Sequence, residues 1–88
     1  MGVLRDYRPR ILFPRPKIGK TFHYSVELLD LNGDIWRFGV YARSLWSCRV
    51  LLSNWEPVLC GWLKVMKIWR TYTNDIEYVR ESWTRKQV

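Results

Sequence analysis

The residues of this chain that could do chemistry are few, and their types favour binding over catalysis. His23 is the only histidine, and Cys48 and Cys60 are the only cysteines. A structural zinc site needs four nitrogen or sulfur ligands, so the sequence predicts no metal centre. The acidic residues are scattered instead of paired, and His23 is interpreted as the cross-strand partner of Tyr41. We therefore predict a protein that is not an enzyme and has no cofactor and no small-molecule substrate.

Cations and aromatic rings are the abundant functional groups. The 88 residues include fifteen Lys and Arg against eight Asp and Glu, a formal net charge of +7, together with six Trp, five Tyr and three Phe. This charge favours nucleic acid, an anionic lipid surface or an acidic protein surface as the partner. A chain of this length buries only about two-thirds of its unfolded surface. We therefore expect some of the rings to face a partner.

The first twenty residues are predicted to form an extended arm. Pro9, Pro14 and Pro16 fix their own φ angles and bias the preceding residues toward extended shapes. Apolar side chains between the prolines would tie this arm, residues 1–20, to a single small domain formed by residues 21–88. A frayed, solvated tail is the alternative. The candidate interaction residues of the arm are Arg5, Arg8, Arg10, Phe13 and Arg15.

Residues 21–41 are predicted to form an antiparallel β-hairpin. Apolar residues alternate with polar ones along two runs, and the Asn32-Gly33 pair between the runs is a turn signal. A three-residue loop fits best, with Asp30 starting a type I turn and Gly33 in the left-handed region. The predicted structural turn residues are Asp30, Asn32 and Gly33.

The register of this hairpin follows from the faces of its side chains. A two-residue loop would pair Leu28 with Arg37 and place the two apolar rows on opposite faces. The three-residue loop instead pairs Leu28 with Trp36 and places Glu27 opposite Arg37, a favourable charge match. We predict the second register.

The rest of the chain is predicted to be helical. An apolar residue recurs every seven positions, with a second apolar residue between each pair, which is typical of one stripe along a helix. The two series are Trp55, Trp62, Trp69, Ile76 and Trp83, and Val58, Val65, Tyr72 and Val79. The predicted fold class is α+β, with the arm, one hairpin (about 21–41) and amphipathic helices at about 44–52, 55–70 and 75–86. Whether residues 55–86 form one helix or two is left open.

The predicted stripe is too long for the hairpin to cover. A stripe of about 28 residues spans about 42 Å, whereas a strand of about seven residues is about 23 Å long. Trp62 and Trp69 are expected to be covered by the hairpin or a neighbouring helix, and Trp83 to face another chain or lipid. The candidate interaction residues of this half are Lys64, Lys67, Arg70 and Trp83.

Three functions are compatible with these features. The first is a non-enzymatic accessory subunit of a large, membrane-associated complex of the organellar respiratory or ATP-synthase type, located at the mitochondrial inner membrane. Its arm and Trp-rich helix would dock onto other protein subunits and an anionic lipid surface. No run reaches the ~18 uncharged residues of a membrane span. The alternatives are an RNA-binding protein, such as a ribosomal subunit, and a small viral or phage inhibitor of a host protein.

Overall fold

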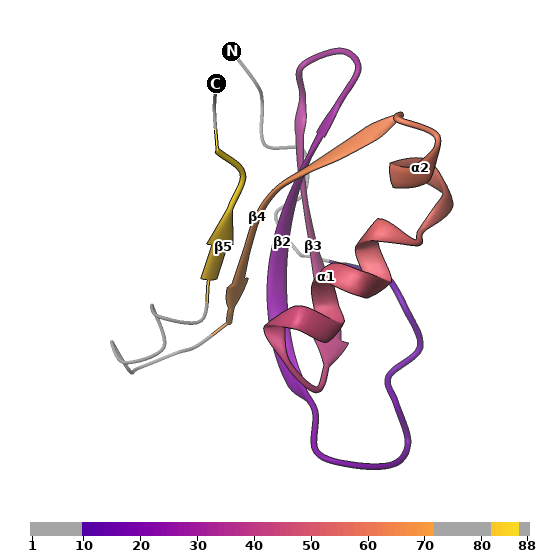
Figure 1. Ribbon diagram of the computed structural model, residues 1–88, viewed down its shortest axis with the longest axis vertical. Helices are drawn as coiled ribbons and strands as arrows, with labels where there is room; N and C mark the ends of the chain where they lie inside the picture. The colour runs from indigo at the N-terminus through magenta and orange to yellow at the C-terminus, as the bar shows by residue number, and fades with distance from the viewer. Residues whose placement is uncertain (1–9, 72–81, 87–88) are drawn as a thin grey trace.

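A five-stranded mixed sheet with two short helices on one face is the main feature of the computed structural model, which describes residues 10–71 and 82–86 (Figure 1). The elements in chain order are β1 (Arg10–Ile11), β2 (Phe22–Asp30), β3 (Ile35–Ala42), α1 (Leu45–Ser53), α2 (Glu56–Leu59), β4 (Leu63–Arg70) and β5 (Ser82–Thr84). The strand order is β1-β3-β2-β4-β5, and only the β1–β3 pair is parallel. Strands account for 45% and helices for 19% of the described residues, so the predicted hairpin with amphipathic helices is wrong as a fold class.

The hairpin itself is confirmed, including its register. Strands β2 and β3 pair Leu28 with Trp36 and Glu27 with Arg37. The Glu27 carboxylate lies 3.8 Å from the Arg37 guanidinium. Gly33 has a φ of +85°, the left-handed value that the three-residue loop requires.

Asp30 holds the turn through its side chain. One carboxylate oxygen accepts hydrogen bonds from the backbone N–H groups of Asn32 (2.8 Å) and Asp34 (2.9 Å). The other accepts the indole N–H of Trp36 at 2.8 Å. The predicted turn residues therefore act together, with Asp30 as the acceptor of the loop's donors.

We expect Gly33→Val to lower the free energy of unfolding by about 1 kcal/mol or more, because a β-branched residue is strained at positive φ. A Cβ atom added at Gly33 would have no other atom within 4 Å, so the cost is that of the backbone alone. Asn32→Val in the same loop is the matched control, since the described non-glycine residues all avoid positive φ. Urea unfolding of both variants checks the difference, and equal losses would contradict it.

The apolar core lies between the sheet and the helices. Strand β2 is at its centre, since residues 24, 26 and 28 are fully buried there. The side chain of Ser44 caps α1 by accepting the Ser47 backbone N–H at 3.1 Å, so the helix predicted at 44–52 is confirmed. The buried apolar residues are Tyr24, Val26, Leu28, Val40, Ala42, Cys48, Leu52, Val65 and Ile68.

The helix predicted at about 55–70 is wrong beyond its first turn. Helix α2 covers only Glu56–Leu59, with Pro57 in its first turn, where a proline is tolerated. Gly61, at a φ of +81°, follows the helix, and the chain continues as strand β4. The helix predicted at 75–86 is contradicted over residues 82–86, which form β5 (Ser82–Thr84) and two residues outside any helix or strand, and residues 75–81 fall outside the described part of the chain.

A β-bulge explains why β4 has a helical pattern. Leu28 is opposite Val65 and its neighbour Glu27 is opposite Lys67, so Met66 is an extra residue in β4. The bulge shifts the alternation of side chains by one position. Val65 and Ile68 are both buried as a result, at a spacing of three that also suits a helix face.

The tryptophans of the predicted stripe lie on separate parts of the structure. Trp55 precedes α2 and packs edge-on against Phe38, at 6.4 Å between ring centroids. Trp62 is 58% exposed, so the prediction that it is covered is wrong. Trp69 belongs to β4, whereas Trp83 belongs to β5 and packs against the core. The described tryptophans therefore form no common stripe; Ile76, Tyr72 and Val79 lie outside the described residues.

The described part of the predicted arm is joined to the sheet. Strand β1 pairs in parallel with β3, and the backbone N–H of Leu12 donates to the carbonyl of Gly39 at 3.0 Å. Phe13 packs edge-on against Trp55 with ring centroids 5.9 Å apart. Leu12 and Phe13 therefore extend the core beyond β3, whereas Ile11 and Ile18 are exposed, and the division into an arm and a domain stays a prediction.

Candidate functional site

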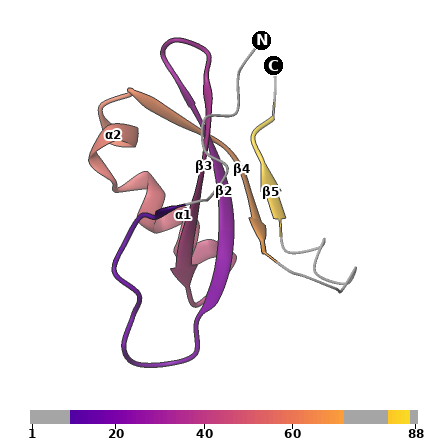
Figure 2. The same cartoon turned by 180° about the vertical axis from the view of Figure 1, so that it is seen from behind.

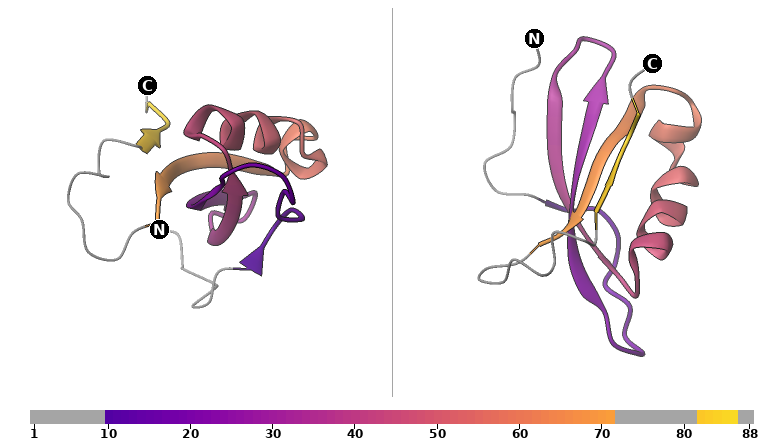
Figure 3. Two further views of the ribbon diagram at one scale, coloured as in Figure 1. Left: turned by 90° about the horizontal axis from the view of Figure 1, so that it is seen from below. Right: turned by 60° about the vertical axis from the view of Figure 1, so that its left-hand side comes forward.

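The two faces of the sheet are covered differently. Helix α1 lies in front of β2 and β3 in Figure 1, with α2 to its upper right, and the view from behind in Figure 2 shows β2 and β3 in front of α1. The right-hand view of Figure 3 shows both helices on one side of the sheet. We call the other side the open face. Side chains alternate along strands, so its residues are the neighbours of the core positions, namely His23, Ser25, Glu27, Leu29, Ile35, Arg37, Gly39, Tyr41, Lys64, Lys67, Trp69 and Thr71.

Trp69 is the largest side chain of the open face, and two cations lie against it. The Arg37 guanidinium is 5.3 Å and the Lys67 ammonium 5.2 Å from its ring centroid. Both distances are within cation–π range. An aromatic ring next to two positive charges can contact a flat, electron-rich group and its negative charge at the same time.

His23 and Tyr41 form a second aromatic site on the same face. Their rings meet edge to face with centroids 5.1 Å apart, as expected for opposite residues of β2 and β3. Nδ1 of His23 lies 2.8 Å from the Thr71 hydroxyl, which also hydrogen-bonds the hydroxyl of Ser25. The Arg15 guanidinium covers the Tyr41 ring at 4.2 Å.

Glycine is required at position 39 for this arrangement. A Cβ atom on Gly39 would collide with the imidazole of His23 and with the end of Ile11 from β1. The absence of a side chain therefore leaves room for the His23 ring beside Gly39 of β3. This contact also removes water from the ring, and burial lowers the pKa of His23 below its usual 6.5.

The lowered pKa of His23 predicts a loss of stability in mild acid. The unfolded chain binds the proton at a higher pH than the folded chain does. The free energy of unfolding should therefore fall as the pH drops below about 6.5 and through the lower pKa of the folded state. We expect His23→Gln to reduce this dependence, and urea unfolding between about pH 7.5 and 5 measures it. If the free energy of unfolding of His23→Gln depends on pH in the same way as that of the unmodified protein does, His23 is not the group responsible.

The structure brings three of the predicted interaction residues to the open face or its margin. Lys64 and Lys67 lie opposite Leu29 and Glu27 of β2, and Arg15 lies on Tyr41. Of these three residues, Lys67 contacts the ring of Trp69. Lys64 and Lys67 were predicted on a helix and Arg15 on the extended arm, whereas the structure places the two lysines on one sheet face with Arg15 at its margin.

Other predicted interaction residues lie elsewhere. Arg70 covers the Phe22 ring at 3.7 Å, and Phe13 and Trp83 pack against the core, so none of these belongs to the open face. Arg10 is exposed in β1 at the sheet edge. Arg5 and Arg8 lie outside the described residues.

The sequence reasoning missed Arg37, Tyr41 and His23 as members of a site. The register that correctly paired Glu27 with Arg37 and His23 with Tyr41 already placed all four on one hairpin face. That signal was available without the structure.

No family model matches the chain, and no similar curated protein or solved structure was found. The function therefore follows from the chemistry of the surfaces.

Within residues 10–71 and 82–86, no three His, Cys, Asp or Glu side chains come together to hold a metal ion. No helix in that part of the chain is long and apolar enough to cross a membrane.

The cysteines are both free. Cys48 is buried in the core, and burial raises the pKa of its thiol to about 12, whereas Cys60 is exposed. A thiol with so high a pKa is almost entirely protonated at neutral pH. Cys48 is thus a packing residue.

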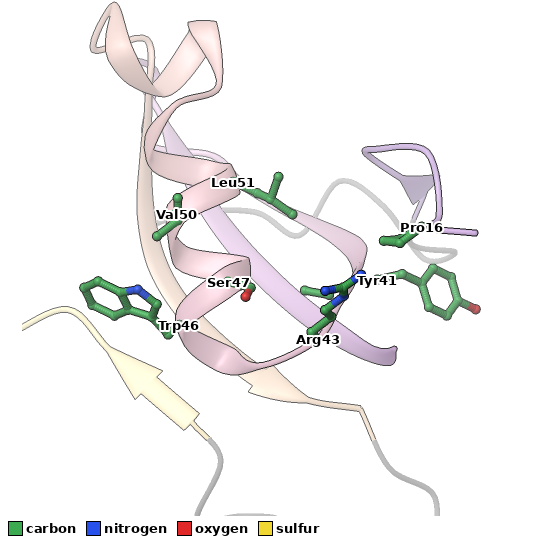
Figure 4. Close-up of a pocket in the computed structure, with 8 residues that line it drawn as sticks. Pro16, Tyr41, Arg43, Trp46, Ser47, Val50 and Leu51 are labelled. Carbon is green, nitrogen blue, oxygen red and sulfur yellow. The ribbon is translucent and has the colours of Figure 1, made fainter. Parts of the chain in front are cut away.

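A second surface, which we call the α1 groove, lies along the outer side of α1. It has a volume of about 510 Å³ and is lined by Pro16, Tyr41, Ala42, Arg43, Trp46, Ser47, Val50 and Leu51. Trp46 is 68% exposed there. In Figure 4 the rings of Trp46 and Tyr41 point away from each other, so the lining does not converge on one point. The groove is apolar but holds few polar groups that could orient a ligand.

Proposed function

We propose that the protein binds single-stranded nucleic acid, with RNA as the expected form, on the open face of its sheet. The observation that carries the proposal is Trp69, which lies on the sheet face that neither α1 nor α2 covers (Figure 3) and contacts both Arg37 and Lys67. Unpaired bases stack on exposed aromatic rings, and each such contact contributes about 1–3 kcal/mol. Bases within a duplex are already stacked on their neighbours, so a single strand is the form that fits a flat platform of rings.

The charges of the open face support the same function. Its cations are Arg15, Arg37, Lys64 and Lys67, and its one described carboxylate, Glu27, is engaged by Arg37. Cations that neutralise phosphates release the condensed counterions and so contribute to affinity. The formal net charge of +7 adds a long-range attraction for the same partner.

The hypothesis of an accessory subunit in a membrane-associated mitochondrial complex stays a prediction, as does that of a viral or phage inhibitor. The tryptophan helix that was to reach a lipid surface is replaced by α2 and β4. What still supports a protein partner is the α1 groove with its exposed Trp46. The open face supports nucleic acid by two independent features, its rings and its cations, and we therefore prefer that function.

Salt dependence tests the proposal. With four cations engaged, the logarithm of the binding constant for a fluorescein-labelled single-stranded RNA should fall with the logarithm of salt concentration at a slope of about −3. Lys67→Gln should weaken binding and make the slope about one unit less steep. Fluorescence anisotropy over a series of salt concentrations measures both quantities.

Lys20→Gln is the matched control for this variant. Lys20 is an exposed lysine whose ammonium lies 5.4 Å from the Phe22 ring, on the side of the sheet that carries the helices. Lys20→Gln removes one positive charge from the molecule, as Lys67→Gln does. Equal slopes for the two variants would show general charge attraction only, and no binding at low salt would refute the proposal.

A further inference from the structure

We propose a phosphate-binding pocket between α1 and β5, on the side of the sheet opposite the open face. The pocket has a volume of about 150 Å³ and is lined by Arg49, Ser53, Val58, Val65, Ile68, Trp83 and Arg85. Figure 3 shows β5 next to α1 at the β4 edge of the sheet. Apolar side chains from α2 and β4 form its floor, and two arginines with Ser53 supply the polar groups.

The two guanidinium groups are held in place by the pocket itself. Arg49 lies 4.6 Å from the ring centroid of Trp83 and 5.6 Å from that of Trp46. Arg85 lies 5.6 Å from the Trp83 centroid, and its Nε donates to the backbone carbonyl of Val65 at 2.7 Å. Side chains fixed in this way lose little further freedom when they bind a ligand.

The charge of the pocket is not balanced by the residues that form it. Both arginines lie against one indole ring, and no carboxylate is among the described residues that line the pocket. Two cations that line one small pocket with no described carboxylate favour an anion as the ligand. The planar guanidinium presents paired N–H donors that match the oxygen atoms of phosphate, and Ser53 offers a hydroxyl.

The size of the pocket restricts the ligand to one small group. Pockets for organic ligands have volumes of roughly 300–1,000 Å³. The present volume of about 150 Å³ is below that range, so a whole nucleotide is too large for it. The ligand is therefore a single phosphate group, either free orthophosphate or the terminal phosphate of a larger molecule.

Titration with orthophosphate tests this site on the intact chain. We expect isothermal calorimetry at constant ionic strength to show binding of orthophosphate that chloride does not reproduce. Arg49→Gln and Arg85→Gln should each weaken it by tenfold or more, and Arg85→Lys should keep part of the affinity, because it keeps the charge and loses the paired donors. Arg43→Gln is the matched control, since Arg43 is an exposed arginine whose described hydrogen bond goes to the Ile18 carbonyl, away from this pocket.

Nuclear magnetic resonance of the unmodified protein gives a second readout that does not depend on whether a variant folds. Orthophosphate should shift the Trp83 indole N–H and Arg85 amide signals and leave the Trp69 indole signal in place. The source of the phosphate is tested with two RNAs of one sequence, one with a 5′-phosphate and one with a 5′-hydroxyl. Tighter binding of the first, lost in Arg85→Gln, assigns the pocket to an RNA end, whereas binding of orthophosphate alone assigns it to the free ion.

The proposal is overturned if orthophosphate produces no heat and no shift of the Trp83 signal, or if Arg43→Gln weakens binding as much as Arg49→Gln does. It stands apart from the function proposed for the open face. Trp69→Ala should leave the affinity for orthophosphate unchanged. Loss of RNA binding with retained phosphate binding, or the reverse, therefore identifies which of the two proposals fails.

Discussion

Replacing Ile68 by alanine is expected to lower the free energy of unfolding by about 2–5 kcal/mol. Ile68 has no exposed surface and lies in β4, opposite Val26 of β2 and on the side of the sheet that faces the helices. Its truncation removes apolar contacts and leaves a cavity that β4, paired on both edges, has little freedom to fill.

Trp62→Ala is the informative control for this prediction. Trp62 is much larger than Ile68 and occupies a position of the predicted heptad stripe, but it is 58% exposed. A surface substitution of this kind should change stability by only about 0.5 kcal/mol. Urea unfolding of both variants decides between the arrangements, because in a helix covered along its stripe Trp62 would be the more costly residue to remove.

The hairpin could be predicted because its information is local. The alternation of side chains, the glycine at position 33 and the charge pair of Glu27 with Arg37 all lie within twenty residues. The alternation and the charge pair each exclude the register shifted by one residue, and Gly33 marks the position of the turn. The first helix was predictable for a similar reason, since Ser44 and the apolar residues after it mark its start.

Strand β4 could not be predicted from the same kind of pattern. Its bulge at Met66 places buried residues three positions apart, so the segment fits a helix as well as a strand. The choice is made by pairing with β2, which lies more than thirty residues earlier in the chain. Gly61, which follows α2 at positive φ, was the local signal that the helix ends there.

The candidate site was predicted in part. Lys64 and Lys67 were selected for their charge, and charge is preserved whichever element carries them. Trp69 was assigned to a covered stripe because a helical period was assumed for the whole segment. Once β4 is a strand, the same residue lies opposite Ser25 on the open face, next to Arg37. Because residues 55–70 were predicted to be a helix, Trp69 was predicted to lie in the core instead of on the open face.

Trp69→Ala is expected to weaken binding of single-stranded RNA by about 5- to 150-fold, which corresponds to the loss of one stacking contact of about 1–3 kcal/mol. The variant leaves all four cations of the open face in place, so the salt dependence should stay close to that of the unmodified protein. Its fold should persist, because Trp69 is only partly buried and lies outside the described core.

The most direct test of the account compares Trp69→Ala with Trp46→Ala in one anisotropy titration with labelled single-stranded RNA at low salt. Trp46, like Trp69, is a tryptophan beside an arginine, with its ring 5.6 Å from Arg49, but it is exposed and lies on α1, on the opposite side of the sheet. If the open face binds RNA, Trp69→Ala loses affinity about 5- to 150-fold while Trp46→Ala keeps that of the unmodified protein. Equal affinities for the two variants, or a loss confined to Trp46→Ala, would contradict it.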